Sequence, residues 1–350
     1  MRYQTPEQMK YEGEEIWFPL SEDILSWDED FHTLMLNDEI RMAAYEAAIK
    51  EIVKPNAVVA EIGTGTGILA QWALEAGARK VFGIDINNKI LEFAKDRIKR
   101  AGFVDKFIPI NKISYEVELP EKVDIVLSEI LGNLGDNEDM TPILNDARKR
   151  FLTNDGIFIP KQVQTYLVPV SSPKIHEQIK TKECRSITTS YNLQELLNKL
   201  GIKNKFDIYY DAIVPLSSYL AEPSLAKSFS FDGTDEATYR IETTHKINKT
   251  GLLTGIKGYF IANLSNDVTL DISGDDIAGR KTSDCWKHCY MPIENPISVE
   301  QNDVLQIIFS RSYPKEKSSP FRQFYRWQGK VLRDSKIVGE FNHGTYKVSV

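Results

Sequence analysis

The feature that most constrains the fold of this chain is a change in the spacing of its apolar residues near position 160. Before that point, short apolar runs alternate with segments of helical periodicity, an order typical of βαβ units around a parallel sheet. Strands are expected at 57–62, 80–85, 107–110 and 123–128, with helices from about 67, over about 87–101 and up to about 152. After Pro160 the apolar residues alternate with polar ones, as in 165–168, 267–272 and 304–309, which predicts a β-sandwich or barrel.

The length of 350 residues allows more than one hydrophobic core, and the change of pattern indicates where they divide. We expect an N-terminal helical segment over 1–35, an α/β domain over 36–160 and a β-rich domain over 161–350. Asn37 and Asp38 are placed to cap a helix whose apolar residues form one stripe. A polar insertion at about 174–222, helical over 190–200, interrupts the β-rich pattern.

Composition and charge narrow the classes of function. Hydrophobic residues make up 42% of the chain and charged residues 27%, as in ordinary globular proteins. No apolar run approaches the roughly 20 residues that cross a bilayer, and the first residues do not resemble a secretory signal, so we expect a cytoplasmic protein. Cys184, Cys285 and Cys289 lack the second pair of a zinc site, so we expect reduced thiols and no metal. The net charge of −7 disfavours nucleic acid as a partner.

A glycine-rich stretch, "VVAEIGTGTGILA", follows the first predicted strand of the α/β domain. Glycines at such a turn let a nucleotide-like ligand approach the backbone N–H groups closely. The dinucleotide pattern G-x-G-x-x-G would need a glycine where Ile68 stands, which disfavours a pyrophosphate ligand. Asp85 ends the next strand, where a carboxylate can accept hydrogen bonds from both ribose hydroxyls. The alternative is that the glycines only shape a tight turn and Asp85 only caps a helix.

A second motif, "SEILGNLGDNE", places two carboxylates just past the carboxyl end of the strand predicted at 123–128. Ligands bind at this edge of open α/β sheets. Two carboxylates suit a planar guanidinium, whose fork of donors each of them can grip. Glu129 and Glu138 are therefore candidate ligands of an arginine side chain, although Glu138 could instead cap the helix that begins near Asp139.

These motifs resemble those of the protein arginine N-methyltransferases, a family of class I S-adenosylmethionine-dependent enzymes. The glycines after Glu61 resemble the first motif of that class, and the nine-position separation of Glu129 and Glu138 matches the paired-glutamate loop of the family. "MLNDEIR" (35–41) resembles the family's N-terminal helix, and "DCWKHCYMPI" (284–293) stands at its Thr-His-Trp loop. The glutamate loop and the ending "FNHGTYKV" are most similar to the branch that makes symmetric dimethylarginine.

The resemblance implies a Rossmann-like class I methyltransferase domain followed by a β-barrel domain with a helical arm at about 174–222. It implies transfer of a methyl group from S-adenosyl-L-methionine to an arginine guanidinium, in a protein or peptide or in free arginine. A catalytically silent relative that acts as a binding scaffold is the alternative. The catalytic residues implied are Glu129, Glu138, Met35, Trp286 and Cys285. The cofactor-binding residues implied are Arg41, Glu61, Gly63, Thr64, Gly65, Gly67, Asp85, Ile86, Ile113, Ser114 and Glu129.

Three departures from the family pattern affect these expectations. The family's Tyr-Phe-x-x-Tyr motif would fall at 22–26, which reads "EDILS", so Trp27 and Phe31 are the candidates to cover the cofactor. Cys285 replaces the histidine of the Thr-His-Trp loop, and Met35 resembles the asymmetric branch. We therefore expect monomethylarginine as the main product.

The insertion corresponds to the family's dimerisation arm. It carries leucines at helical spacing, which would be more apolar surface than an isolated arm exposes: Leu193, Leu196, Leu197 and Leu200. We therefore expect a homodimer in which this arm docks on the partner. The basic and aromatic stretch "RQFYRWQ" (322–328) alternates as a barrel strand would, and a nucleic-acid surface is not expected there.

Overall fold

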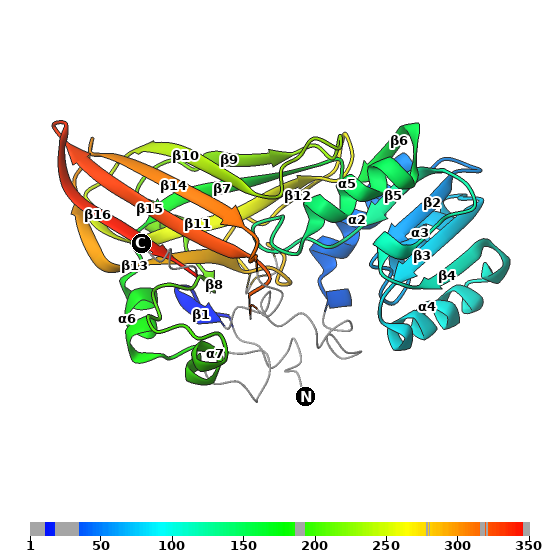
Figure 1. The fold of residues 1–350 in the computed structure, drawn as a ribbon, viewed down its shortest axis with the longest axis horizontal. Helices are drawn as coiled ribbons and strands as arrows, with labels where there is room; N and C mark the ends of the chain where they lie inside the picture. The colour runs from blue at the N-terminus through cyan, green and yellow to red at the C-terminus, as the bar shows by residue number, and fades with distance from the viewer. Residues whose placement is uncertain are drawn as a thin grey trace.

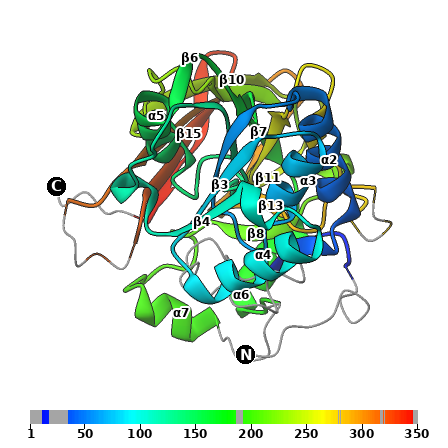
Figure 2. The same cartoon turned by 90° about the vertical axis from the view of Figure 1, so that its right-hand side faces the viewer.

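The computed structural model describes residues 11–17, 35–185, 193–277, 279, 281–315, 319 and 321–345. An α/β domain and a long β-barrel lie end to end along the longest axis of the molecule (Figure 1). Viewed along that axis, the barrel lies behind the α/β domain (Figure 2). The predicted succession of a Rossmann-like domain and a barrel is confirmed.

The α/β domain is built on a five-stranded parallel sheet in the order β4-β3-β2-β5-β6. Its strands are β2 (Val58–Ile62), β3 (Lys80–Asp85), β4 (Phe107–Asn111), β5 (Val123–Ser128) and β6 (Leu152–Ile159). Its helices are α2 (Glu39–Ile52), α3 (Ile68–Glu75), α4 (Asn88–Arg100) and α5 (Met140–Arg150). Since β2 is flanked by β3 and β5, the order of connection reverses at β2, and the carboxyl ends of these three strands form the ligand-binding edge expected of such a sheet.

Local sequence explains where the helices of this domain begin. Asp38 caps α2, because its Oδ1 accepts a hydrogen bond from the Arg41 backbone N–H at 2.9 Å. Asn87 caps α4 in the same way, accepting from the N–H of Lys89 at 3.1 Å. Gly67 precedes α3 with φ +77°, and a Cβ there would lie 2.8 Å from the Cβ of Ala94. Only glycine fits this position, since a side chain would both clash and force a left-handed backbone.

The barrel consists of two antiparallel sheets. The first has the order β1-β8-β13-β11-β7-β9, with β12 (Thr269–Asp271) paired to β11. Its other strands are β1 (Glu15–Trp17), β7 (Gln162–Val170), β8 (Tyr210–Ile213), β9 (Ser224–Phe229), β11 (Gly251–Asn263) and β13 (His288–Val299). The second has the order β10 (Tyr239–Lys246), β14 (Val304–Ser312), β15 (Phe324–Arg333) and β16 (Lys336–Gly344). Alternate residues of β14, such as Leu305, Ile307 and Phe309, are buried in the barrel core.

The insertion forms two helices, α6 (Pro173–Thr181) and α7 (Leu193–Lys199), on the same lower side of the barrel in both views (Figures 1 and 2). All four leucines of the second helical stretch are buried within the chain's own core, each less than 5% exposed. The expectation that they present an apolar surface to a partner is therefore wrong. They contribute to the hydrophobic core of the same chain instead.

Of the N-terminal segment expected to be helical, the described residues include strand β1, which pairs with β8. Trp27 and Phe31 lie outside the described residues. The three cysteines are free thiols. None of the helices in the described parts of the chain is long and apolar enough to span a membrane.

Candidate functional site

A cavity of about 590 Å³ opens at the carboxyl ends of β2, β3 and β5. Its size is ordinary for a site that takes a cofactor or small ligand. Of the residues implied by the family resemblance, those lining it are Met35, Arg41, Glu61, Gly63, Thr64, Gly65, Asp85, Ile86, Glu129 and Glu138. The glycine-rich motif and the glutamate loop thus line the same cavity, although they lie far apart in the sequence.

Asp85 holds the glycine turn in place. One carboxylate oxygen accepts a hydrogen bond from the N–H of Gly65, and the other from the N–H of Asn87, both at 2.8 Å. Gly63 and Gly65 have positive φ angles of 75° and 54°, so the turn needs glycine at both positions. Asn87, not Asp85, caps the helix. Asp85 lines the cavity, and each of its carboxylate oxygens can accept a further hydrogen bond.

Glu61 lies at the end of β2 and is only 1% exposed. Its Oε2 has no hydrogen-bond partner among the residues that the structure describes. Burial raises the pKa of Glu61 well above its ordinary value. A buried acceptor without a partner costs about 1–3 kcal/mol, so a donor group on a ligand would be favourable here.

Arg41, from the first turn of α2, forms an ion pair with Glu129. Its Nη1 also donates to the carbonyl of Met35 at 3.2 Å, and its guanidinium carbon lies 5.6 Å from the centre of the Trp286 ring. Burial is the largest single influence on the pKa of Arg41 and acts to lower it, but the acidic groups around the guanidinium, Glu129 foremost, together raise the pKa above its ordinary value. One of the two glutamates therefore already holds a guanidinium group in the ligand-free protein.

Glu138 lines the same cavity and forms no hydrogen bond or ion pair with the residues that the structure describes. Burial, followed by the nearby charge of Glu129, raises its pKa to about 8. The start of α5 is satisfied by Asp136, whose Oδ1 accepts a hydrogen bond from the N–H of Thr141 at 2.8 Å. Glu138 is therefore available to bind a cation rather than used as a helix cap.

The second half of the glutamate loop is fixed by side chains of the barrel. Arg311 forms a fully buried ion pair with Asp136. Asp139 has φ +65°, and its Oδ1 accepts hydrogen bonds from the amide of Gln323 at 2.6 Å and the hydroxyl of Tyr313 at 2.8 Å. These contacts fix the chain at Asp136 and at Asp139, on either side of Glu138. Its position therefore depends on residues more than 170 positions away.

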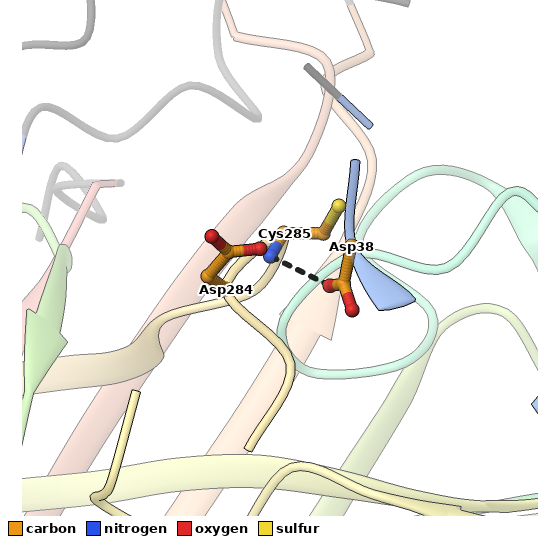
Figure 3. Close-up of side chains that lie close together, drawn as sticks. All are labelled: Asp38, Asp284 and Cys285. Atoms are coloured by element: carbon orange, nitrogen blue, oxygen red, sulfur yellow. Dashed lines mark hydrogen bonds between the residues drawn. The ribbon is translucent and has the colours of Figure 1, made fainter. Parts of the chain in front are cut away.

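Trp286 and Cys285 do not line the cavity but support it. The indole Nε1 of Trp286 donates to the carbonyl of Leu131 at 2.5 Å, beneath the first half of the glutamate loop. The backbone N–H of Cys285 donates to Asp38 Oδ2 at 3.0 Å, as Figure 3 shows. Burial raises the pKa of the Cys285 thiol well above its usual range, so it stays protonated.

Asp38, Asp284 and Cys285 lie close enough together to suggest a metal site (Figure 3). The Asp38 carboxylate, however, already accepts hydrogen bonds from Ser283 Oγ and from the N–H groups of Arg41 and Cys285. These bonds tie α2 to the loop before β13. The cluster is explained by that structural role.

Three residues implied as cofactor ligands lie elsewhere than on the cavity wall. Gly67 starts α3, and Ile113 is 45% exposed at the surface. Ser114 is buried, and its carbonyl accepts a hydrogen bond from Arg150 at 2.7 Å. Conversely, the cavity is lined by Tyr45, Lys89 and Arg322, which the sequence did not point to. Arg322 lies within a stretch that was expected to be strand, but β15 begins only at Phe324.

Comparisons with known proteins agree with this architecture. The family model described as "PRMT5 oligomerisation domain" matches residues 162–335, and the one described as "Ribosomal protein L11 methyltransferase (PrmA)" matches residues 44–159. Two solved structures match 91% of this chain and 98% of their own: the Trypanosoma brucei PRMT1 enzyme-prozyme heterotetrameric complex with AdoHcy (TM-score 0.74, 20% identity) and Arabidopsis thaliana protein arginine methyltransferase 10 (TM-score 0.75, 19% identity).

Curated relatives give matches of two kinds. Protein arginine N-methyltransferase PRMT10 of Oryza sativa subsp. japonica is 38% identical over 141 residues, which cover 39% of this chain and only 37% of that protein. Arginine N(omega)-methyltransferase of Streptomyces achromogenes subsp. streptozoticus is 26% identical over 288 residues, 79% of this chain and 74% of that protein. Arginine methyltransferases thus occur among both the curated relatives and the solved structures, and the matches to the solved structures extend over both domains. In sequence and in fold, the chain is similar to the protein arginine N-methyltransferases.

Proposed function

We propose that this protein is an S-adenosylmethionine-dependent N-methyltransferase that methylates an arginine guanidinium nitrogen. The observation that carries the proposal is that Glu129 and Glu138 face the same cavity as the glycine turn and Asp85. A nucleotide-like ligand and a guanidinium bound there would be neighbours. A scaffold protein would have no need for both sets of groups in one cavity.

The residues present fit the cofactor. Bound S-adenosylmethionine supplies an electrophilic methyl group. Asp85 would accept hydrogen bonds from the ribose hydroxyls, while the turn at Gly63 and Gly65 lets the ligand approach the backbone. The unpartnered Oε2 of Glu61 would accept a hydrogen bond from a donor on the ligand, and Arg41 is a cation of the cavity wall that would bind the ligand's carboxylate.

The two glutamates would bind and orient the acceptor. An arginine side chain keeps its proton at neutral pH because its pKa lies above about 12. Carboxylates that grip two of its nitrogens favour positive charge there and leave the third nitrogen with a more available lone pair. Holding that nitrogen at near-attack distance is the larger contribution, since orientation alone can account for about 7–11 kcal/mol in favourable systems.

The ion pair between Arg41 and Glu129 supports this role, because it shows a guanidinium to be complementary to the site. It also means that an acceptor must share or displace Arg41. We infer that Arg41 moves toward the carboxylate of the bound cofactor and so makes Glu129 available. Met35 lines the cavity beside Arg41 and would limit the space for a methylated guanidinium, which favours monomethylarginine as the product.

We also propose a homodimer that acts in the cytoplasm. The family model for the barrel is described as an oligomerisation domain, and the trypanosome relative was solved as a heterotetramer. The buried leucines of α7 mean that such an interface would have to use other surfaces of the arm. Light scattering at micromolar concentration tests this point, and a monomer would contradict it.

Isotopically labelled S-adenosylmethionine tests the proposed activity. The protein is incubated with free arginine, an arginine-containing peptide or a cell lysate, and the products are identified by fragmentation mass spectrometry. We expect label on a guanidinium nitrogen. Tight cofactor binding with no transfer to any guanidine would favour the scaffold instead.

A further inference from the structure

Arg322 is a cation in a cavity wall whose acceptor side is otherwise carboxylate. The described residues that line the cavity come from the α/β domain and from residues 35–45, with Arg322 as the one contribution of the barrel. It is half-buried and forms no hydrogen bond or ion pair with the residues that the structure describes. A guanidinium at this place repels the guanidinium of an acceptor unless it has another group to bind.

The position of Arg322 is built by its neighbours. Phe321 is 7% and Gln323 3% exposed, so the chain is anchored on both sides of Arg322. The Gln323 amide donates to Asp139 Oδ1 at 2.6 Å, and Asp139 directly follows Glu138. Arg322 is thus held near Glu138 in the wall of the same cavity. It is also close enough to oppose the effects of burial and of Glu129 on the pKa of Glu138.

An acceptor with a guanidinium at one end and a carboxylate at the other could bind both the glutamates and Arg322. In arginine, the α-carbon lies about 6 Å from the central guanidinium carbon when the side chain is extended, at bond lengths of roughly 1.5 Å. A carboxylate at that distance from the glutamates could be bound by a second long side chain of the cavity wall, and Arg322 is such a side chain. Arginine binds carboxylates through two parallel hydrogen bonds, which gives orientation as well as affinity.

We propose that Arg322 binds the carboxylate of the acceptor, so that the preferred substrate is a carboxylate-bearing guanidine such as free arginine. This inference rests on the proposed function and narrows its substrate class. An arginine within a peptide chain presents an amide at the same place and would leave Arg322 without a partner. A carboxyl-terminal arginine presents the same chemistry as free arginine, and the acceptors below distinguish the two.

The test compares kcat/KM for four acceptors with saturating S-adenosylmethionine: L-arginine, agmatine, which lacks only the carboxylate, Gly-Gly-Arg, and its carboxyl-terminal amide. The variants are Arg322→Ala and Arg322→Lys. Arg326→Ala is the matched control, because Arg326 lies on the same segment but its Nε donates to Asn342 at the exposed surface. The cofactor dissociation constant is measured for each variant by calorimetry.

We expect the wild-type protein to prefer L-arginine to agmatine by about 10- to 100-fold, the value of a hydrogen-bonded charge pair. Arg322→Ala should remove most of that preference by raising KM for arginine, Arg322→Lys should keep part of it, and Arg326→Ala should keep all of it. A preference for Gly-Gly-Arg over both its amide and free arginine would show that the carboxylate bound by Arg322 is that of a carboxyl-terminal arginine, and would overturn free arginine as the substrate.

Equal kcat/KM for arginine and agmatine in the wild-type protein would overturn the inference. So would an equal loss with both acceptors in Arg322→Ala, since that indicates a general structural effect. Methylation of lysate proteins with none of the four small guanidines accepted would also overturn the inference. If the folded wild-type protein binds the cofactor but transfers no methyl group to these guanidines or to any lysate protein, the proposed function itself fails.

Discussion

The two halves of the cavity are held by different means. The glycine turn is fixed by its own domain: Gly63 and Thr64 donate to the carbonyl of Ile84, and Gly65 to the Asp85 side chain. The glutamate loop is fixed largely by the barrel, through Arg311, Tyr313 and other side chains. The cofactor half is therefore a local structure, whereas the acceptor half forms only when both domains are in place.

Substitution of Glu138 should have the largest effect and separate the two halves most clearly. Glu138→Gln keeps the shape but removes the charge that faces the acceptor, so we expect turnover to fall by about 10²- to 10³-fold. The cofactor dissociation constant, measured by calorimetry, should stay within about twofold of the wild-type value. Near-normal turnover, or loss of cofactor binding, would remove Glu138 from the acceptor half.

Breaking the buried ion pair at Arg311 tests whether the barrel holds the glutamate loop. Arg311→Met leaves the buried Asp136 carboxyl without its partner, which typically costs about 3–5 kcal/mol, and we expect lower stability in urea together with reduced turnover. Tyr313→Phe is the milder variant, since it removes one donor to Asp139. It should lower turnover severalfold with an unchanged cofactor dissociation constant. Two results together would contradict the claim that the barrel holds the glutamate loop: full activity in Tyr313→Phe, and a loss of turnover in Arg311→Met no larger than its loss of folded protein.

Asp85→Ala is the converse experiment in the cofactor half. It removes the proposed acceptor for the ribose hydroxyls and the partner of the Gly65 N–H, so cofactor affinity should fall by about 10- to 100-fold. At saturating cofactor, turnover should recover substantially. An unchanged dissociation constant would exclude this role for Asp85.

The raised pKa of Glu138 predicts a pH dependence. Because the acceptor needs ionised Glu138, kcat/KM should rise by about tenfold per pH unit below the pKa of about 8 and level off above it. In Glu138→Gln this rise should be missing. The same shift lowers the stability of the ligand-free protein as pH rises from 4.5 to about 8, since over this range folding keeps a proton that the unfolded carboxyl has already lost; above about 8 the contribution is constant.

The smallest expected effect is the influence of the bound cofactor on the affinity for the acceptor. Since Arg41 holds Glu129 in the ligand-free protein, S-adenosylhomocysteine should tighten acceptor binding by up to about tenfold by drawing Arg41 away. Calorimetric titration of arginine with and without S-adenosylhomocysteine measures this coupling. The same affinity in both titrations would show that Arg41 does not compete with the acceptor.

The difference between the two halves also explains what the sequence could predict. The turn that contains Gly63 and Gly65 follows a strand directly, and Asp85 ends the next strand. Their positions in the sequence therefore predict that they lie at the same edge of the sheet. Arg322 could not be found in this way, because it reaches the cavity from the far end of the chain through a barrel whose register the sequence does not specify.

The arm shows a similar limit. Four leucines at helical spacing indicate an apolar face, but only the packing of α7 shows that this face is covered by the same chain. Likewise, the spacing of Glu129 and Glu138 pointed to a pair of carboxylates, while the protonation of Glu138 and the pairing of Glu129 with Arg41 depend on burial and on neighbours remote in sequence.

The most direct test of the account is single-turnover transfer from labelled S-adenosylmethionine to arginine, measured beside cofactor affinity in the wild-type protein, Glu138→Gln and Asp85→Ala. The account predicts a labelled guanidinium in the wild-type protein, no appreciable transfer in Glu138→Gln despite normal cofactor binding, and weak cofactor binding with transfer restored at high concentration in Asp85→Ala. A wild-type protein that binds the cofactor and transfers no methyl group to any guanidine would contradict it.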